Sequence, residues 1–90
     1  MSEEPKKPAI AVALEYETGT RAAPKVVATG RGLVAERIME IARENCVTIE
    51  ANPMLAEALS GVPVDDTIPH ELYQAVAEVI GFVLRAQQRR

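Results

Sequence analysis

The apolar residues of this chain change their spacing along the sequence, and that change restricts the possible fold more than any other feature. They alternate over residues 9–16, which predicts a strand, and a short valine-rich strand follows at residues 25–29. Residues 33–45 carry apolar side chains at helical spacing, and residues 46–50 alternate again. We expect the first two strands to pair in antiparallel fashion. The second strand, the helix and the third strand together predict a βαβ unit, with parallel strands and a right-handed crossover.

Two more helices are predicted after this unit. Asn52 followed by Pro53 is typical of a helix start, because the Asn side chain accepts a free backbone N–H and proline has none to lose. An extended linker over residues 62–67 separates this short helix from the last one, which should begin at Pro69 and end near Gln88. We therefore predict an α/β domain: a small mixed sheet of about three strands, with one βαβ unit, flanked by three helices.

The composition sets limits on domain number, location and partners. Ninety residues suffice for one small domain, which we place at residues 9–88, after a disordered polar leader at residues 1–8. The net charge is −3 and no basic run occurs, which argues against nucleic acid as a partner. No window holds the ~18 uninterrupted apolar residues of a membrane span. Cys46 is the only cysteine, which fits a reducing compartment, so we expect a cytoplasmic protein that is not inserted in a membrane.

Residues that often carry chemistry are few, and each has a simpler structural interpretation. His70 is the only histidine and lies in the first turn of a predicted helix, where a solvated side chain is the usual case. Cys46 has no second cysteine or neighbouring histidine in sequence, so a half-buried small side chain is favoured over a catalytic thiol. Asp65 and Asp66 lack further ligands for a metal. We expect no catalytic residue, no metal and no cofactor, and hence a protein that is not an enzyme.

Three sequence blocks, in this order, carry a resemblance to a known family. They are Ala-Ala-Pro-Lys-Val-Val-Ala-Thr-Gly at residues 22–30, Asn-Pro-Met-Leu-Ala-Glu-Ala-Leu at 52–59, and Ile-Pro-His-Glu-Leu-Tyr-Gln-Ala-Val-Ala-Glu-Val-Ile at 68–80. Together they resemble the cytoplasmic C-terminal domain of the FlhB family, the export switch of flagella and its injectisome relatives. The resemblance runs from about residue 10 to residue 84.

The chain also departs from the pattern of full-length family members. Those proteins carry a membrane domain, a linker, one more strand and a self-cleaving Asn-Pro-Thr-His site, and none of these is present in this sequence. Asn52-Pro53 matches a different family segment, a helix start, and is followed by Met54-Leu55. The cleavage position would fall just before Ile10, where no Asn is found. We therefore expect no self-cleavage and a chain that resembles a stand-alone copy of the C-terminal fragment.

The resemblance implies a function in protein export and two kinds of partner. It implies a non-enzymatic accessory of the flagellar type III export apparatus that binds export substrates or export-gate proteins and influences substrate-specificity switching. The family's substrate-binding patch maps onto Ala23, Pro24, Ala77 and Ile80. Core packing is the alternative role for the helical pair, and an extended loop is the alternative role for Pro24.

The second implied partner is the N-terminal part of FlhB, which would add a strand to the edge of the strand that begins near Ala9. Pairing of that edge with the leader residues is the alternative, although Pro5 and Pro8 disfavour it. Two alternative functions stay open at this point. One is an injectisome-associated homologue, and the other is an oligomerising scaffold that has lost export binding.

Overall fold

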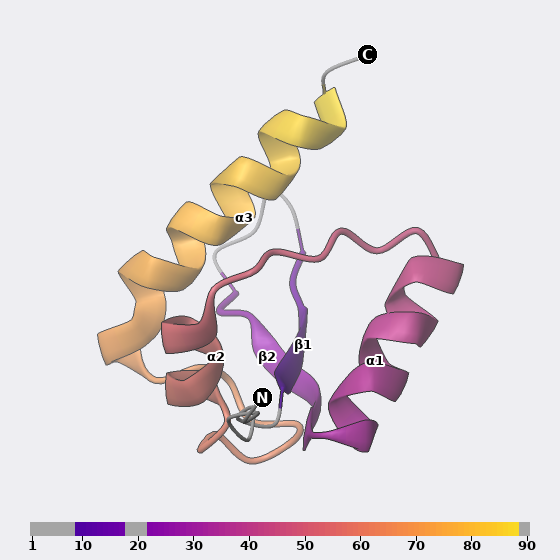
Figure 1. Cartoon of the computed structure of the whole chain (residues 1–90). Coiled ribbons are helices and arrows are strands. Elements are labelled where there is room, and N and C mark those ends of the chain that lie inside the picture. Colours follow the sequence, from indigo (N-terminus) through magenta and orange to yellow (C-terminus); the bar gives the residue numbers. More distant parts are fainter. Residues whose placement is uncertain (1–8, 18–21, 89–90) are drawn as a thin grey trace, which may run out of the picture.

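The computed structural model describes residues 9–17 and 22–88 of the chain. Its elements follow in the order β1 (Ile10–Glu15), β2 (Lys25–Arg31), α1 (Leu33–Glu44), α2 (Pro53–Leu59), a short 3-10 helix η1 (His70–Leu72) and α3 (Tyr73–Gln88). Figure 1 shows α1 on one side of the two strands and α2 and α3 on the other. The α/β class and the three helices are confirmed. The leader predicted at residues 1–8 lies outside the described residues.

The two strands form an antiparallel pair with one irregularity. Ile10 pairs with Arg31, and the register shifts between Ala13 and Leu14, so that Leu14 lies opposite Val26. Alternation along β1 sends Val12 and Leu14 to one face and Ala11 and Ala13 to the other.

The face with Val12 and Leu14 holds the hydrophobic core. Five buried residues make up its centre: Val26, Leu59, Val62, Ile68 and Val76. Val12, Leu14, Leu55, Leu72 and Ile80 pack against them from the strands and helices around. Because β2, α2, α3 and the segment before η1 all contribute, this one cluster connects most of the chain.

The opposite face is covered by α1, and the contact is built from small residues. Ala35 is the one buried residue of α1, and Ala11 is buried on β1. Gly30 lies so close to α1 that an added Cβ would be 2.2 Å from Cγ1 of Val34 and 3.3 Å from its carbonyl carbon. Gly32, the residue before α1, has a φ of 60°, which favours glycine. The two glycines therefore have separate roles, close approach and turn formation.

The predicted third strand is wrong. Residues 46–50 carry no strand assignment, and β1 and β2 form a two-stranded antiparallel sheet in the described part of the chain, so no βαβ unit is present there. At the end of α1, the amide of Cys46 donates a hydrogen bond to the carbonyl of Arg43 at 3.2 Å. The amide of Val47 donates one to the carbonyl of Ala42 at 2.8 Å. This is the Schellman pattern, with Cys46 at a φ of 60°, and it uses amides that a strand would offer to a neighbour. Val47 and Ile49 remain exposed.

The predicted start of α2 is confirmed. The Oδ1 of Asn52 accepts a hydrogen bond from the amide of Leu55 at 3.1 Å, and Pro53 occupies the first turn. The extended segment between Cys46 and Ala51, which we call the α1–α2 connection, is thus held at both ends, by a Schellman motif and by an N-cap. Figure 1 shows it crossing from α1 to α2.

Candidate functional site

The loop half of the predicted substrate patch consists of Ala23 and Pro24, just before β2. Both are partly exposed. The carbonyl of Pro24 accepts a hydrogen bond from the amide of Ile68 at 3.0 Å, so the loop is tied to the core through a residue that is 3% exposed. Pro24 therefore lies in a fixed, extended position at the protein surface.

The helical half, Ala77 and Ile80, lies on α3 with a spacing of three residues. Ala77 is exposed, which excludes the core-packing alternative for this residue. Ile80 is partly exposed and packs against the core cluster, so the core alternative holds in part for Ile80. Ile80 and Pro24 are both attached to the cluster that contains Ile68, one by side-chain packing and the other by a backbone hydrogen bond. The four residues flank one core, and their assignment as a common binding surface stays a prediction.

A second candidate site is the outer edge of β1. The carbonyl of Ala9 accepts a bond from the amide of Gly32 at 2.8 Å, so the backbone groups of every second residue from Ala9 point toward β2. Those of Ile10, Val12 and Leu14 consequently point away from β2. Within residues 9–17 and 22–88, no strand pairs with this edge. Proline, lysine and arginine, which commonly protect edge strands, do not occur in β1.

The outer edge of β2 provides a contrast, because it is paired at its first two residues, Lys25 and Val26. The amide of Val26 bonds to the carbonyl of Asp66 at 2.9 Å, and the amide of Asp65 bonds to the carbonyl of Val26 at 2.6 Å. Lys25 and Thr67 add an isolated bridge. Asp65 has a φ of 77°, and no sequence pattern signals this, since the sequence indicates only an extended linker here. In the described part of the sheet, the outer edge of β2 is thus paired at Lys25 and Val26, whereas no strand pairs with the outer edge of β1.

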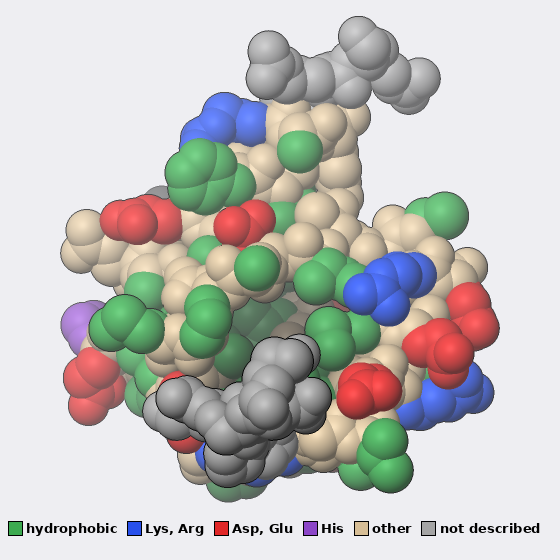
Figure 2. All heavy atoms as spheres, viewed as in Figure 1, with side chains coloured by type: hydrophobic (Ala, Val, Ile, Leu, Met, Phe, Trp, Pro, Cys, Tyr) green, Lys and Arg blue, Asp and Glu red, His purple; other side chains and the backbone are tan. Residues whose placement is uncertain are grey.

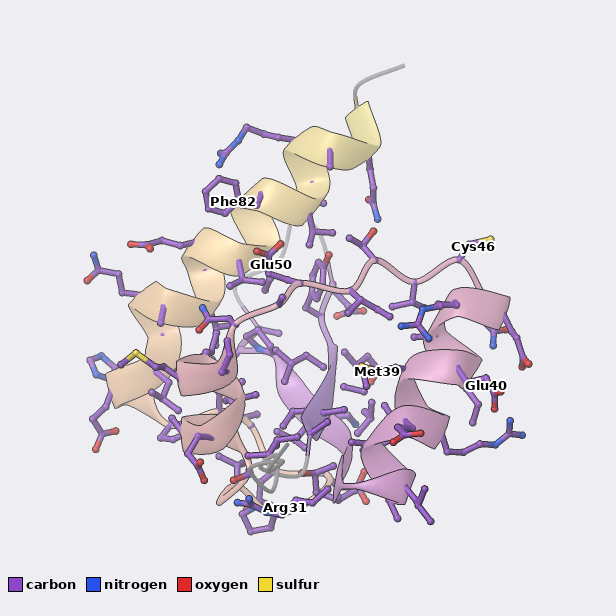
Figure 3. The ribbon with its side chains drawn as sticks, in the orientation of Figure 1. Arg31, Met39, Glu40, Cys46, Glu50 and Phe82 are labelled. Carbon is purple, nitrogen blue, oxygen red and sulfur yellow. The ribbon has the colours of Figure 1, made fainter. Side chains whose placement is uncertain are left out.

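The surface next to β1 is concave. Figure 2 shows a hollow lined by hydrophobic side chains between α2 and α1, below the α1–α2 connection. In Figure 3, Met39 projects from α1 toward β1, whereas Glu40 points to solvent. The open edge therefore adjoins apolar side chains rather than a charged surface, which suits an extended apolar segment.

Arg31 connects β2 to α2 next to this region. Its Nη2 donates to Oε2 of Glu57 at 3.0 Å and to Oγ of Ser60 at 3.3 Å. Both charged side chains are more than half exposed, so the pair contributes at most about 1 kcal/mol to stability. Its effect is to orient α2 relative to the end of β2 (Figure 3).

The residues considered for catalysis do not converge on one place. His70 is exposed and contacts the ring of Tyr73, with ring centroids 5.0 Å apart, while Cys46 is exposed at the far end of α1. No group of three or more metal-ligating side chains occurs among the residues that the structure describes. No helix within the same residues combines the length and hydropathy of a membrane span.

Comparison with known proteins gives a consistent result. Residues 8–83 match the model of the FlhB HrpN YscU SpaS family. The chain is 40% identical over 78 residues to the protein YlqH of Bacillus subtilis, covering 87% of this chain and 84% of YlqH. It is 46% identical over 80 residues to the flagellar biosynthetic protein FlhB of Escherichia coli, covering 88% of this chain and 21% of FlhB. The chain thus spans about a fifth of the length of that FlhB.

Solved structures resemble most of the chain. The cytoplasmic domain of FlhB from Shewanella putrefaciens has a TM-score of 0.80 at 40% identity, with 90% of this chain and 66% of that chain covered. The PscU C-terminal domain has a TM-score of 0.77 at 32% identity, with 82% of this chain and 95% of that chain covered. About one third of the solved FlhB domain lies outside the match.

Proposed function

Because the chain belongs to the FlhB HrpN YscU SpaS family, we propose that it acts as a non-enzymatic accessory of the flagellar type III protein export apparatus. It carries an FlhB-like type III export-switch domain. The observation that supports the proposal most is the match to the FlhB cytoplasmic domain over 90% of the chain, with a TM-score of 0.80. In this role it works in the cytoplasm, at the export gate, and influences which substrates are exported.

The identities favour the flagellar system over an injectisome. The FlhB of Escherichia coli is 46% identical to the chain and the solved FlhB domain 40%, whereas the PscU domain is 32% identical. We therefore place the chain with FlhB and keep the injectisome-associated homologue as the second candidate.

Export substrates are proposed to bind at Ala23, Pro24, Ala77 and Ile80. The exposed methyl of Ala77 beside the half-buried Ile80, on a helix fixed to the core, offers a small apolar surface without charge. The fixed Pro24 loop lies at the same core cluster. A contact of this size supports weak binding, with a Kd of order micromolar to millimolar, which suits a station that releases its cargo.

The test of this site compares two alanines of α3. Ala77→Asp places a charge in the proposed surface, and Ala75→Asp places the same charge at another exposed position of the same helix. Both variants should keep the circular dichroism spectrum of the parent, because neither carboxylate is buried. We expect Ala77→Asp to lose binding of rod- or hook-type export substrates and Ala75→Asp to retain it. Equal binding by the folded Ala77→Asp variant would remove this surface from consideration.

The cellular test asks whether the chain can stand in for the C-terminal domain of FlhB. A host whose FlhB lacks that domain is compared with and without this chain in a motility assay. Restored motility, lost again with Ala77→Asp, supports the accessory function. If motility is not restored although the chain is expressed and folded, replacement of the FlhB domain is excluded.

The second proposed partner is the N-terminal part of FlhB, bound by strand addition to β1. The open edge, the outward backbone groups of Ile10 and Val12 and the adjoining apolar hollow support it. Copurification of the chain with FlhB that lacks its C-terminal domain tests this partner. A second copy of the chain on the same edge, seen as a dimer in sedimentation, would favour the scaffold alternative.

A further inference from the structure

The C-terminal half of α3 extends beyond the core and carries exposed side chains. Figure 1 shows this half passing the ends of the two strands. Among the described residues, Ile80 is the last residue of α3 that packs against the core cluster. In Figure 3, Phe82 projects from α3 away from the sheet, and it is 58% exposed. This aromatic side chain therefore leaves most of its apolar surface available for contact with another molecule.

Four residues, which we call the α3 outer face, lie together on this part of the helix. They are Glu78, Gly81, Phe82 and Arg85, and their spacing of i, i+3, i+4 and i+7 places them on one side of a helix. At 3.6 residues per turn, that side is opposite Val76, which is 1% exposed. Gly81 is partly exposed and the other three are exposed. The α3 outer face is thus directed away from the core.

Gly81 leaves space on this face. Apart from its chain neighbours and the backbone of the helix, an added Cβ would meet a single heavy atom within 4 Å, Nη1 of Arg85 at 3.5 Å. Gly30 differs, because Val34 leaves no room there for a Cβ. Glycine inside a helix is less stable than alanine, and in Gly81 no close packing within the chain offsets that cost. Its position beside Phe82 suits the close approach of a second helix.

The two charges of the α3 outer face make no ion pair within residues 9–17 and 22–88. Glu78 and Arg85 are about 10.5 Å apart along the helix axis, too far to pair with each other. The guanidinium carbon of Arg85 lies 4.9 Å from the centroid of the Phe82 ring, which keeps this charge beside the ring. The face therefore presents one negative and one positive charge, on either side of Gly81 and Phe82.

We propose that the α3 outer face binds the same face of a second copy of this chain, with the two helices antiparallel about a two-fold axis between Gly81 and Phe82. Glu78 of each copy then lies at the level of Arg85 of the other, because the two positions are equally far from the axis. The two Phe82 rings meet beside the axis, and the two Gly81 residues let the backbones approach. The proposal goes beyond the proposed function and does not depend on it.

The order of the charges favours a second copy over other partners. A face of one sign fits any partner of the opposite sign, whereas this face carries both signs and is complementary to its own reverse. The two ion pairs are equivalent by symmetry and flank an aromatic contact. One helix from each copy buries less than the roughly 1,200 Å² of a stable complex, so we expect a weak dimer with a Kd of order 10–1,000 µM.

Sedimentation equilibrium of the intact 90-residue chain, at concentrations up to about 1 mM, measures this dimer. Glu78→Arg places a guanidinium opposite Arg85 of the other copy, and Arg85→Glu places a carboxylate opposite Glu78. Each variant should weaken the dimer by about tenfold or more. An equimolar mixture of the two variants should associate like the parent, because every opposed pair then has opposite signs. The control is Glu44→Arg on α1, an exposed position with the same change of charge, which should keep the parent's Kd.

The outcomes decide between this contact and others. A parent chain that stays monomeric at the highest concentration overturns the proposal. Association that persists in both charge-reversal variants also overturns it, because the contact then lies elsewhere, as on the outer edge of β1. A mixture of the two variants that stays monomeric overturns the antiparallel arrangement. Loss of the dimer in Glu44→Arg would show a general effect of charge and would overturn the proposal as well.

Gly81→Glu and Phe82→Ala test the contact at the axis independently. Gly81→Glu places a long side chain where the backbones approach, and in the monomer it displaces only the flexible end of Arg85. The thermal midpoint of the dilute monomer should stay at or above that of the parent, because glutamate favours a helix more than glycine does. Both variants should weaken the dimer by about tenfold, the loss typical of a central contact. Parent-like association by either variant would overturn the proposal.

Discussion

On the face of the sheet that Val12 and Leu14 line, branched side chains from several elements close a core, whereas the face that Ala11 lines is covered by α1. The first face buries Val76 at 1% exposure, and the second leaves Val34 and Ile41 of α1 at 55% and 43%. Apolar burial is thus distributed unequally between the two faces. The core face holds most of the buried branched side chains, and α1 with the connection that follows it leaves several apolar side chains exposed.

Valines on the two sides provide the most direct test of this difference. Val76→Ala removes two methyl groups from the core and should lower the free energy of unfolding by roughly 2–3 kcal/mol. Val47→Ala makes the same change in the exposed connection and should change it by less than about 0.5 kcal/mol. Urea unfolding of both variants measures the two values. Similar losses would show that the connection is packed in solution, and the comparison would then fail.

The contact between α1 and the sheet is tested by adding atoms instead of removing them. Gly30→Ala places a methyl 2.2 Å from Cγ1 of Val34, so the first turn of α1 must shift, and we expect a loss of about 1–2 kcal/mol. Gly61→Ala is the control, because its nearest contact would be the Ala58 carbonyl oxygen at 4.0 Å. Thermal unfolding compares the two. An equal, small effect for both would show that α1 packs loosely enough to yield.

The N-cap of α2 lies between the two regions and should matter less. Asn52→Ala removes the acceptor for the amide of Leu55 and should destabilise the protein by roughly 0.5–2 kcal/mol. Substrate binding should persist at temperatures where the variant is folded, because Asn52 lies outside the proposed patch. Asn52→Asp, which keeps an acceptor oxygen, should retain the parent's thermal midpoint. An unchanged midpoint for Asn52→Ala would contradict the role of the cap.

The smallest expected effect has the opposite sign. Cys46→Gly relieves a left-handed backbone at the end of α1 and should raise stability by a few tenths to about 1 kcal/mol. Cys46→Ser, which keeps a Cβ, should leave the midpoint unchanged. A lower midpoint for Cys46→Gly would indicate that the Cys46 side chain makes contacts that outweigh the backbone strain.

The sequence predicted the parts of the fold that depend on local signals. The helix start at Asn52 is governed by neighbours within one turn, and it was predicted correctly. The third strand was wrong because a strand requires a partner on its edge, which local alternation at Val47 and Ile49 does not reveal. The pairing of Val26 with Asp65 and Asp66 was missed for a related reason, since a single positive φ at an Asp follows from tertiary contacts.

The candidate site was predictable to a different degree at each residue. Ala77 was assigned to the patch through the family resemblance, with core packing as the alternative, and the structure places it on the surface. Ile80 belongs to the apolar stripe of α3, and its division between core and surface depends on how closely α3 approaches the sheet. The spacing of three residues predicts that Ala77 and Ile80 are neighbours on one helix. The position of the Pro24 loop beside the core depends on its hydrogen bond to Ile68, 44 positions further along the chain, which local sequence does not reveal.

The small residues under α1 restrict which amino-acid substitutions this domain can accept during evolution. Ala11, Ala35 and Gly30 have almost no side chain to lose, so nearly every substitution there adds atoms to a contact that has no room for them. At Val26 and Val76 many substitutions subtract atoms and leave a void. In a randomised library, we therefore expect smaller side chains to be rejected both under α1 and in the core. Substitutions that keep the volume of the side chain and change its shape should be accepted in the core alone. The residues in the contact beneath α1 should therefore accept very few substitutions. The exposed positions of the same helix should accept many.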